Sequence, residues 1–293
     1  MSALGKSSVR LQGVYTVKAL REFIGSLQLT HNTIALVPTM GNLHEGHLSL
    51  MHLAREYADI VICSIFVNPT QFGLGEDFSG YPRTLMEDEA LLEKQGLVHL
   101  VFAPEEKDIY PFGLDNTAKI TMPGLSKELC GSGRPGHFDG VASVVLRLLN
   151  LISPDILVLG EKDYQQLILL KRLVRDLHLP VQIVSGVIHR EADGLAMSTR
   201  NQYLSPAERK VAPKLYCELV KLSKLIKSGG EDCQTLVKQS LSSLEAFGFK
   251  PEYIEVRRSI DLGKPMETES PDGLIILAAA WLGNARLIDN IQL

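Results

Sequence analysis

Residues 33–55 most constrain the fold, because a strand, a tight turn and a helix follow one another within them. The apolar run Ile34–Val37 predicts a buried strand. Pro38 and Gly41 predict its end, since proline lacks an N–H for the ladder and glycine permits a sharp turn. Apolar residues at helical spacing follow, up to Arg55. The backbone N–H groups and dipole at a helix N-terminus favour negative charge, so this corner predicts an anion site.

Two histidines, His44 and His47, stand three residues apart at the expected start of this helix. If the helix begins near them, both rings face one pocket, where imidazole N–H groups can stabilise charge developing on a phosphate. The alternatives are a polar cap and a metal site. The metalloprotease pattern needs a spacing of four with a glutamate between, so a spacing of three is a weak metal signal. The stretch therefore favours phosphate or nucleotide binding.

Length and charge narrow the class of protein. The 293 residues suggest two domains, and 30 basic against 34 acidic residues give a net charge of −4 without a long basic run. A nucleic-acid interface is therefore not expected. The four cysteines lack zinc-site spacing and fit reduced thiols. With no signal-like segment and no apolar run of about 18 residues, we expect a soluble cytoplasmic protein with no membrane partner.

Further apolar runs predict the other strands of a parallel sheet: Ile60–Val67, Val98–Phe102, Asp155–Leu159 and Val181–Ile188. Helical patterns lie between them, and strand–helix–strand order implies right-handed crossovers. Ligands of such sheets bind outside the carboxyl ends of the strands, which places Asn68 and Gln71 beside His47. The Asn-Pro pair that begins at Asn68 is also typical of a plain turn.

The helices expected in the first part of the chain are Val17–Leu27, one within Tyr81–Gln95, Val141–Ile152 and one from Tyr164 to about Leu177. Beyond residue 187, we expect one helix from Ser205 to about Lys227, another over Asp232–Phe247, and strands at Tyr253–Arg257 and Leu274–Trp281. The expected fold is α/β: a Rossmann-like parallel sheet in a nucleotide-binding domain (1–186), and a smaller C-terminal α/β domain (187–293).

Two further regions offer cations for a phosphate. Residues 104–140 are rich in glycine and proline around Arg134 and His137, and this loop could cover a phosphate or simply lie on the surface. Lys162 follows a predicted strand, where its ammonium can meet a phosphate as a point charge. A solvated charged turn is the alternative, but the position at the strand end favours a functional role.

Five segments, in order and in register, resemble the pantoate–β-alanine ligase (pantothenate synthetase) family of HxGH-type nucleotidyltransferases. They are Pro38–His47, Phe66–Phe72, Tyr81–Thr84, Gly160–Gln166 and Met197–Asn201. The resemblance covers nearly the whole chain, and five motifs together are far more specific than one. It implies ATP-dependent condensation of (R)-pantoate with β-alanine through a pantoyl-adenylate, with release of AMP and pyrophosphate. It also implies a nucleotidyltransferase-type Rossmann domain that binds nucleotide and pantoate, a C-terminal lid domain that closes over it, and a homodimer.

The resemblance also implies roles for particular residues. His47 corresponds to the proton donor, and His44 and Lys162 complete the catalytic set. Gln71, Gln165 and Asn68 would hold pantoate, and Gln71 would also contact β-alanine. The implied ATP-binding residues are Met40, Gly41, Asn42, Leu43, His44, Glu45, Gly46, His47, Gly160, Glu161, Lys162, Asp163, His189, Met197, Ser198, Thr199 and Arg200. Mg²⁺ would come with ATP, near Asp88 or Glu87, and no protein-bound metal is expected.

Two positions depart from the family pattern. Thr199 stands where the family commonly has serine, and it keeps the hydroxyl. His189 stands where the bacterial pattern usually has a small apolar residue whose backbone meets the adenine, so adenine affinity is the property that this change affects.

Three other functions compete with the ligase. A nucleotidylyltransferase of the same superfamily would need more cationic residues for its acceptor phosphate than residues 68–71 offer. A catalytically inactive nucleotide-binding regulator would be expected to lose His47 or Lys162, and both are present. An aminoacyl-tRNA synthetase would need a basic RNA-binding segment, which is missing from the sequence.

Overall fold

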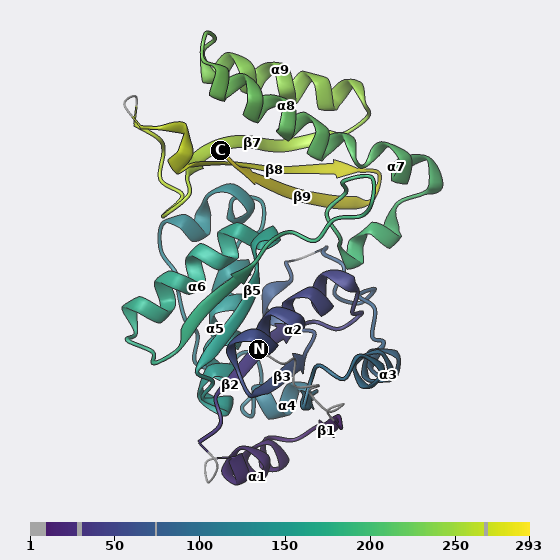
Figure 1. Cartoon of the computed structure of the whole chain (residues 1–293), viewed down its shortest axis with the longest axis vertical. Helices are drawn as coiled ribbons and strands as arrows, with labels where there is room; N and C mark the ends of the chain where they lie inside the picture. Colours follow the sequence, from purple (N-terminus) through teal and green to yellow (C-terminus); the bar gives the residue numbers. More distant parts are fainter. Residues whose placement is uncertain (1–9, 28–30, 74, 267–268) are drawn as a thin grey trace, which may run out of the picture. The chain divides into compact units, whose positions relative to one another are not determined.

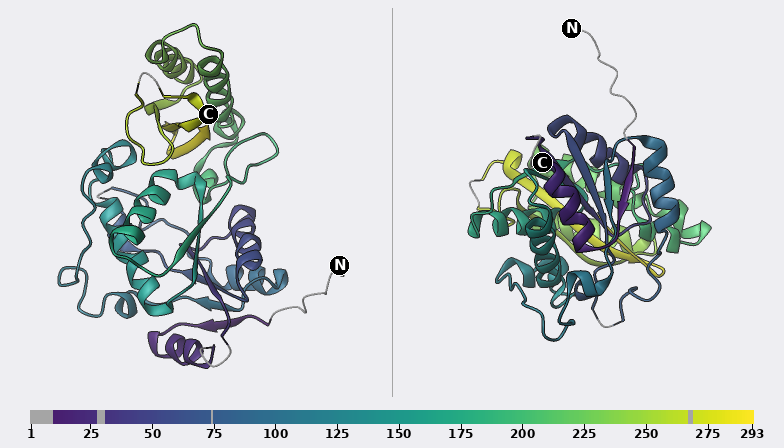
Figure 2. Two further views of the ribbon diagram at one scale, coloured as in Figure 1. Left: turned by 60° about the vertical axis from the view of Figure 1, so that its left-hand side comes forward. Right: turned by 90° about the horizontal axis from the view of Figure 1, so that it is seen from below.

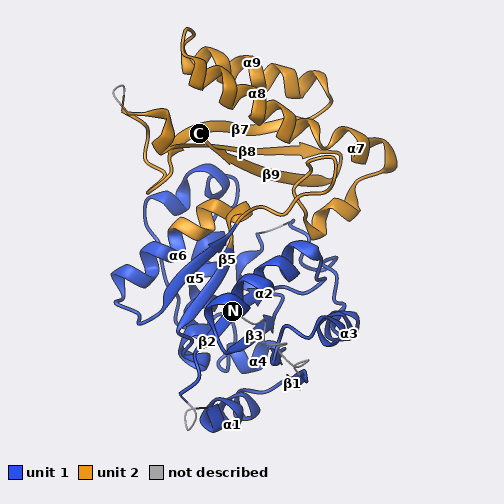
Figure 3. Ribbon diagram, in the orientation of Figure 1, with its two compact units in different colours: residues 1–159, 169–186 blue, residues 160–168, 187–293 orange. Residues whose placement is uncertain are grey.

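The computed structural model describes residues 10–27, 31–73, 75–266 and 269–293. The chain divides into two compact units (Figure 3). Unit 1 contains the residues up to 159 together with 169–186, and unit 2 contains 160–168 together with 187–293. The division into a binding domain and a lid at residue 187 stays a prediction, because compactness alone does not assign function.

Unit 1 is built on a six-stranded parallel sheet in the order β1-β4-β3-β2-β5-β6 (Figure 1). The strands are β1 (Gln12–Val14), β2 (Ile34–Thr39), β3 (Ile60–Ile65), β4 (Leu100–Phe102), β5 (Ile156–Gly160) and β6 (Gln182–Gly186). Taken from β2 onward, the five later strands have the chain order 3-2-1-4-5 of a Rossmann sheet. The order reverses between β2 and β5. The predicted α/β fold with a parallel sheet is confirmed.

Helices lie on both sides of this sheet (Figure 2). The helices of this part of the chain are α1 (Val17–Leu27), α2 (Glu45–Tyr57), α3 (Leu85–Gln95), α4 (Glu106–Ile109), α5 (His137–Ile152) and α6 (Tyr164–Asp176). Alternate residues of β2 point to opposite faces, as strand geometry requires. Ala35 and Val37 pack with Met51 of α2 in one buried cluster, whereas Leu36 is fully buried outside that cluster. Burial on both faces explains why the strands are continuous apolar runs.

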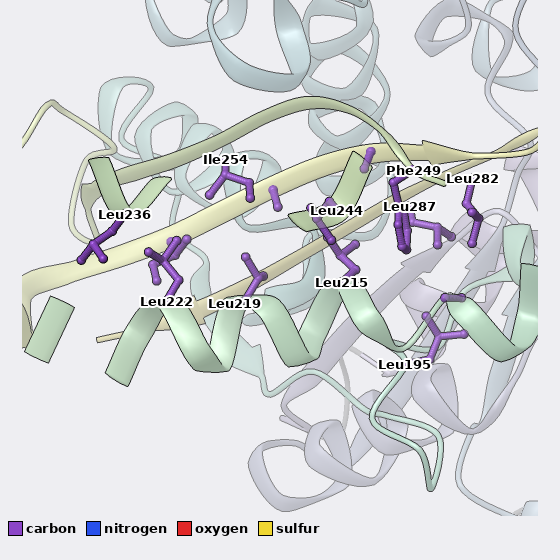
Figure 4. Close-up of a cluster of buried hydrophobic side chains, with 14 of the residues drawn as sticks. Leu195, Leu215, Leu219, Leu222, Leu236, Leu244, Phe249, Ile254, Leu282 and Leu287 are labelled. Atoms are coloured by element: carbon purple, nitrogen blue, oxygen red, sulfur yellow. The ribbon is translucent and has the colours of Figure 1, made fainter. Parts of the chain in front are cut away.

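Unit 2 contains an antiparallel sheet in the order β7-β8-β9. Its elements are α7 (Pro206–Val211), α8 (Lys214–Ser228), α9 (Cys233–Ala246), β7 (Lys250–Arg258), β8 (Leu274–Leu282) and β9 (Ala285–Gln292). Leu219 and Leu222 of α8 and Leu244 of α9 pack with Ile254 and Leu287 of the sheet (Figure 4). This separate core lets unit 2 bury its own apolar surface.

Several predicted elements were wrong in their limits. The long helix from Ser205 to Lys227 is two helices, α7 and α8, because Pro213 lacks the N–H that a continuous helix would need. Pro38 lies inside β2 instead of ending it. Among the residues of β2, only Ala35 and Leu36 pair with β5, so Pro38 lies beyond the paired residues on that side of the strand. The strand predicted to reach Val67 ends at residue 65, and β1 and β9 were not predicted.

None of the helices in the described part of the chain is both long and apolar enough to cross a bilayer.

Candidate active site

The corner between β2 and α2 depends on two residues with left-handed backbone. Gly41 has a φ of 80°, and Asn42 has a φ of 50°. A Cβ on Gly41 would lie 3.1 Å from both Asp88 Oδ2 and Ile65 Cγ2. Glycine meets both demands at once, since it tolerates positive φ and takes no side-chain space. Met40 and Leu43 lie in the same turn, and Glu45 is the exposed first residue of α2.

The two histidines predicted to bind phosphate cap the N-terminus of α2. His44 is the N-cap, and its Nδ1 accepts a hydrogen bond from the backbone N–H of Gly46 at 3.1 Å. His47 Nδ1 accepts one from the backbone N–H of His44 at 3.3 Å, which completes a capping box. Because each Nδ1 is an acceptor, each neutral ring carries its proton on Nε2. The ring centroids lie 4.0 Å apart, so the corner contains two adjacent imidazole donors.

Asp88 of α3 holds the turn between β2 and α2 through hydrogen bonds to its backbone. Its Oδ2 accepts a hydrogen bond from Asn42 N at 2.9 Å, and its Oδ1 accepts one from Leu43 N at 2.7 Å. The hydroxyl of Thr84 donates to Oδ2 at 3.1 Å. The Asp88 side chain is buried, so these bonds replace its hydration. These contacts give the carboxylate a structural task in the turn, and they do not make it a ready Mg²⁺ ligand.

Asn68, which follows β3, is fully buried and uses both ends of its amide. Its Oδ1 accepts hydrogen bonds from the hydroxyls of Tyr110 at 2.6 Å and Thr70 at 2.9 Å. Its Nδ2 donates to Gln71 Oε1 at 3.0 Å and to Gly140 O at 3.3 Å. These contacts orient the Gln71 amide. The contact of Asn68 with pantoate stays a prediction.

Gln71 joins the carboxyl ends of two neighbouring strands. With its Oε1 held by Asn68, its Nε2 points to Met40 Sδ at 3.1 Å, beyond the end of β2. The parallel sheet therefore brings the Gln71 amide to the strand end that leads into the histidine corner, as the sequence predicted. Gln71 is 9% exposed, which suits an amide that meets a small ligand in a nearly dry site.

Arg134 and His137, left open by the sequence, support the backbone of Gln71. His137 Nδ1 lies 2.7 Å from Gln71 O, and its Nε2 lies 2.9 Å from Arg134 Nη1. A carbonyl only accepts and a guanidinium only donates, so His137 is neutral with its proton on Nδ1. Arg134 also forms a two-bond ion pair with Glu76, both at 2.7 Å. Burial opposes ionisation of Glu76, but the bonds and charge of Arg134 prevail and lower the pKa of that carboxyl.

Helix α5 approaches the same turn without room for a side chain. A Cβ on Gly140 would lie 2.8 Å from Gln71 N and closer still to Thr70 O. Real Cβ atoms do not approach so closely, and the neighbouring atoms are backbone that cannot move aside. Glycine at this position therefore lets the helix press against the turn that carries Gln71.

In unit 2, residues 160–165 carry another group of predicted binding residues. Gly160 ends β5, and residues 161–163 form a single 3-10 turn before α6. The Lys162 side chain is 22% exposed, and its Nζ lies 4.0 Å from Asp163 Oδ2. Gln165 is buried in the first turn of α6. A partly buried ammonium group and a buried amide are suited to phosphate oxygens and hydroxyl groups, respectively.

The remaining predicted ATP residues lie on one hairpin and the turn after it. The hairpin closes through a bridge between Arg190 and Ala196, and Met197 N donates to His189 O at 3.0 Å. Ser198 then caps a 3-10 turn over residues 199–203, because its hydroxyl accepts from Arg200 N at 3.3 Å. Thr199 is buried in that turn. The exposed His189 is thus tied by its carbonyl to the start of the Met197–Arg200 motif.

The supporting residues were harder to find from the sequence than the predicted binding residues. Asp88, Glu76 and Tyr110 act across distances of 45, 58 and 42 residues, respectively. No local pattern joins such partners, because they meet only after the sheet has formed. The one usable signal was the Tyr-Pro-Arg-Thr motif before α3, whose Thr84 bonds to Asp88.

Known proteins match the chain along nearly its whole length. The family described as Pantoate-beta-alanine ligase matches residues 12–292. The protein named Pantothenate synthetase from Pseudomonas aeruginosa (strain UCBPP-PA14) is 48% identical over 281 residues, which cover 95% of this chain and 98% of that protein. The Pantothenate synthetase of Azotobacter vinelandii is 48% identical over 278 residues, which cover 94% of this chain and 97% of that protein.

Two crystal structures agree with these sequence matches. Pantothenate synthetase from Thermus thermophilus has a TM-score of 0.88 and 40% identity, with 96% of this chain and 99% of that chain covered. Pantoate-beta-alanine ligase from Francisella tularensis, complexed with beta-gamma ATP and beta-alanine, has a TM-score of 0.80 and 34% identity, with 97% of each chain covered. The match over residues 12–292 and the 48% identity to full-length relatives show that the chain belongs to the pantoate–β-alanine ligase family.

Proposed function

We propose that this ligase uses ATP to convert (R)-pantoate into a pantoyl-adenylate, which β-alanine then converts into pantothenate. Family membership makes the chain a pantoate–β-alanine ligase, so the proposal concerns how the acyl group is activated. The observation that carries it is the pair of rings of His44 and His47, with Nε2 protons at the N-terminus of α2. The Francisella relative, complexed with ATP and β-alanine, supports both molecules as substrates.

The first step forms one bond and breaks another. A carboxylate oxygen of pantoate bonds to the α-phosphorus of ATP, and the bond from that phosphorus to the bridging oxygen of the β-phosphate breaks. Negative charge grows on the α-phosphate oxygens and on the leaving pyrophosphate. Donors that are already oriented lower this barrier because they need no reorganisation as the charge appears. His44 and His47 would supply such donors, with His47 as the principal one.

The second step needs an acyl-adenylate that water cannot reach. The uncharged amides of Gln71 and Gln165 would bind the hydroxyl groups of pantoate without repelling its carboxylate. The neutral amine of β-alanine then attacks the acyl carbon and loses one proton to solvent, and AMP leaves with the electron pair of the broken C–O bond. A dry site protects the intermediate from hydrolysis until the amine arrives. Hydrogen bonds from Asn68 to the Gln71 side chain and between His137 and the Gln71 carbonyl hold Gln71 in place, which supports its assignment to this site.

Unit 2 would supply the remaining ATP contacts. Lys162 would bind phosphate as a point charge, and Arg200 could bind phosphate oxygens through two parallel N–H groups. The backbone around His189 and the segments 160–163 and 197–200 would bind the rest of the nucleotide, as the motifs predict.

Magnesium would arrive on the phosphates of ATP, because it retains much of its water and takes few protein ligands. Within the described ranges, no group of three or more His, Cys, Asp or Glu side chains could hold a metal ion. The predicted dependence on Mg²⁺, the lack of tightly bound zinc, the homodimer and the cytoplasmic location all stay predictions.

The order of the two steps provides the test of this proposal. With pantoate and Mg–ATP but no β-alanine, the enzyme should exchange labelled pyrophosphate into ATP, because the first step needs no amine and is reversible. Adding β-alanine should then release AMP and form the amide in equal amounts. Omitting pantoate is the control, and it should abolish the exchange.

A nucleotidylyltransferase would behave differently in the same assay, since it would leave AMP attached to its product and ignore the amine. If pantoate supports no exchange while a phosphorylated acceptor becomes stably adenylylated, the adenylate mechanism proposed here is wrong.

A further inference from the structure

Asn290 of the C-terminal strand β9 holds the turn that carries Lys162. The Asn290 Nδ2 donates hydrogen bonds to two successive backbone carbonyls, Glu161 O at 2.9 Å and Lys162 O at 3.1 Å. Both protons of the side-chain amide are therefore used on this one turn. Asn290 is 6% exposed, so water does not readily replace these bonds. The partners lie 129 and 128 residues apart in sequence.

The residue before it, Asp289, anchors the second predicted ATP segment of unit 2. Arg190 forms a bidentate ion pair with Asp289, at 2.7 and 2.8 Å, and also donates to Gly194 O at 3.1 Å. The Arg190 guanidinium stacks over the Tyr216 ring with its central carbon 3.6 Å from the ring centroid. Bidentate pairing and stacking both fix the plane of the guanidinium. The hairpin that leads into Met197–Arg200 is thereby fixed to β9.

Asp289 and Asn290 are also joined to each other and to Arg190 by hydrogen bonds. Asp289 Oδ1 accepts a hydrogen bond from Asn290 N at 2.8 Å, and Arg190 Nη2 donates to Asn290 O at 3.4 Å. Burial raises the pKa of the Asp289 carboxyl, and Arg190 together with the Asn290 amide opposes that rise. Two consecutive residues of one strand thus hold both segments of unit 2 that are predicted to contact ATP.

We propose that Asn290 is a positioning residue for ATP activation and that it acts through Lys162. This inference rests on the proposed function of Lys162. Asn290 fixes the backbone from which the lysine side chain extends, so the ammonium group keeps one place relative to the Met197–Arg200 turn within unit 2. Small displacements of a charged group matter, since a misplacement of about 1 Å can cost about 100-fold in rate.

The test compares Asn290→Ser and Asn290→Leu with Gln239→Leu. A serine hydroxyl can bond at most one of the two carbonyls, and leucine can bond neither. Gln239 is the matched control because its amide, exposed on α9 of unit 2, bonds to the side chain of Glu231 and holds neither predicted ATP segment. Pantoate-dependent pyrophosphate exchange should fall about 10- to 100-fold in Asn290→Leu, less in Asn290→Ser, and not in Gln239→Leu.

Two further readouts separate positioning from general damage. Amide hydrogen exchange should accelerate at residues 161–165 in both Asn290 variants, while exchange in β8 stays as in the unaltered enzyme. The effect of Asn290→Ser on the rate should also largely disappear in a Lys162→Ala background, because residues that act through one another are not additive.

The inference would be overturned if amide hydrogen exchange at residues 161–165 were unchanged in the Asn290 variants. It would also be overturned if Asn290→Ser lowered the rate of pyrophosphate exchange equally in the Lys162→Ala background. If the variants show the predicted amide hydrogen exchange but the unaltered enzyme catalyses no pantoate-dependent pyrophosphate exchange, Asn290 still positions the turn and the proposed function is wrong.

Discussion

The corner between β2 and α2 and the turn after β5 carry the same kind of predicted task, but they are held in different ways. His44 and His47 hold each other's rings and backbone within four residues, through a capping box. The Lys162 turn takes its support from Asn290, which lies 128 residues further along the chain. The first arrangement can form as soon as the helix forms. The second requires β9 to be paired in its sheet.

The comparison shows why one site residue is easier to predict than its support. A capping box satisfies backbone groups that every helix N-terminus leaves without intrahelical partners, so its residues must be close in sequence. A lysine turn after a strand has no such local requirement. Its geometry depends on whichever side chain the folded chain brings to it, which here is an amide about 128 residues away.

The largest effect is expected from His47→Ala. Loss of the ring should lower the rate of adenylation by about 10²–10³, the usual scale for removing one preorganised donor in a transition state. ATP affinity should change less, since the backbone and dipole at the helix N-terminus remain. Single-turnover measurements of adenylate formation, with ATP binding measured separately, check this outcome.

His47→Gln is the matched variant that tests whether the local cap or the imidazole is responsible. A glutamine at this position can still accept a bond from the N-cap backbone, as in other capping boxes. If His47→Gln restored a normal rate, no proton transfer from the imidazole would be needed, and its assignment as a proton donor would be wrong.

A smaller effect, on stability, is expected from Asp88→Asn. The histidine corner also has one distant support, because Asp88 accepts hydrogen bonds from the backbone N–H groups of Asn42 and Leu43. An amide has one accepting end, so one of these buried donors would face an NH₂ group. The free energy of unfolding should fall by about 1.5–3 kcal/mol, the range for hydrogen bonds to charged groups.

Urea denaturation measures this change, and Glu87→Gln is the control. Glu87 lies in the same first turn of α3, but it is exposed. Equal losses in the two variants would show that the charge at the helix N-terminus matters and that the support of the turn does not.

The smallest effect is a pH dependence confined to unit 1. Burial, with the Arg55 guanidinium beside it, lowers the pKa of His99 to about 4 from the ordinary 6.5. Its Nδ1 accepts from Val61 N at 3.0 Å, which requires that nitrogen to be unprotonated. Between pH 6.5 and about 4, His99 binds a proton in the unfolded chain but not in the folded one. The stability that neutral His99 contributes is therefore complete above pH 6.5 and is lost as the pH falls through about 4.

Two probes can follow the units separately during acidification. Hydrogen exchange in β3 reports on unit 1, and fluorescence reports on unit 2 because Trp281, in β8, is the chain's single tryptophan. Protection in β3 should decrease before the fluorescence changes, and His99→Asn should reduce that loss because asparagine does not titrate. Loss of protection in β3 that is identical in His99→Asn would assign the acid sensitivity to another group.

The sequence by itself was sufficient for the elements whose signals are local. Continuous apolar runs predicted β2, β3 and β5, because strands buried on both faces have no polar side. The order of strands and helices predicted the parallel sheet, and the motifs predicted the family. His44 and His47 were predicted at a helix start because capping and charge at a helix N-terminus act over a few residues.

Only the tertiary structure decided what holds these residues in place. In the folded chain, Asn68 and His137 form hydrogen bonds with Gln71, and Asp88 accepts hydrogen bonds from the backbone of the histidine corner. Asn290 donates to the backbone of the Lys162 turn. The physical reason is that a buried polar group takes whichever complementary partner the packed chain brings within about 3 Å. Sequence spacing predicts such a partner only when both groups lie on one turn of one element.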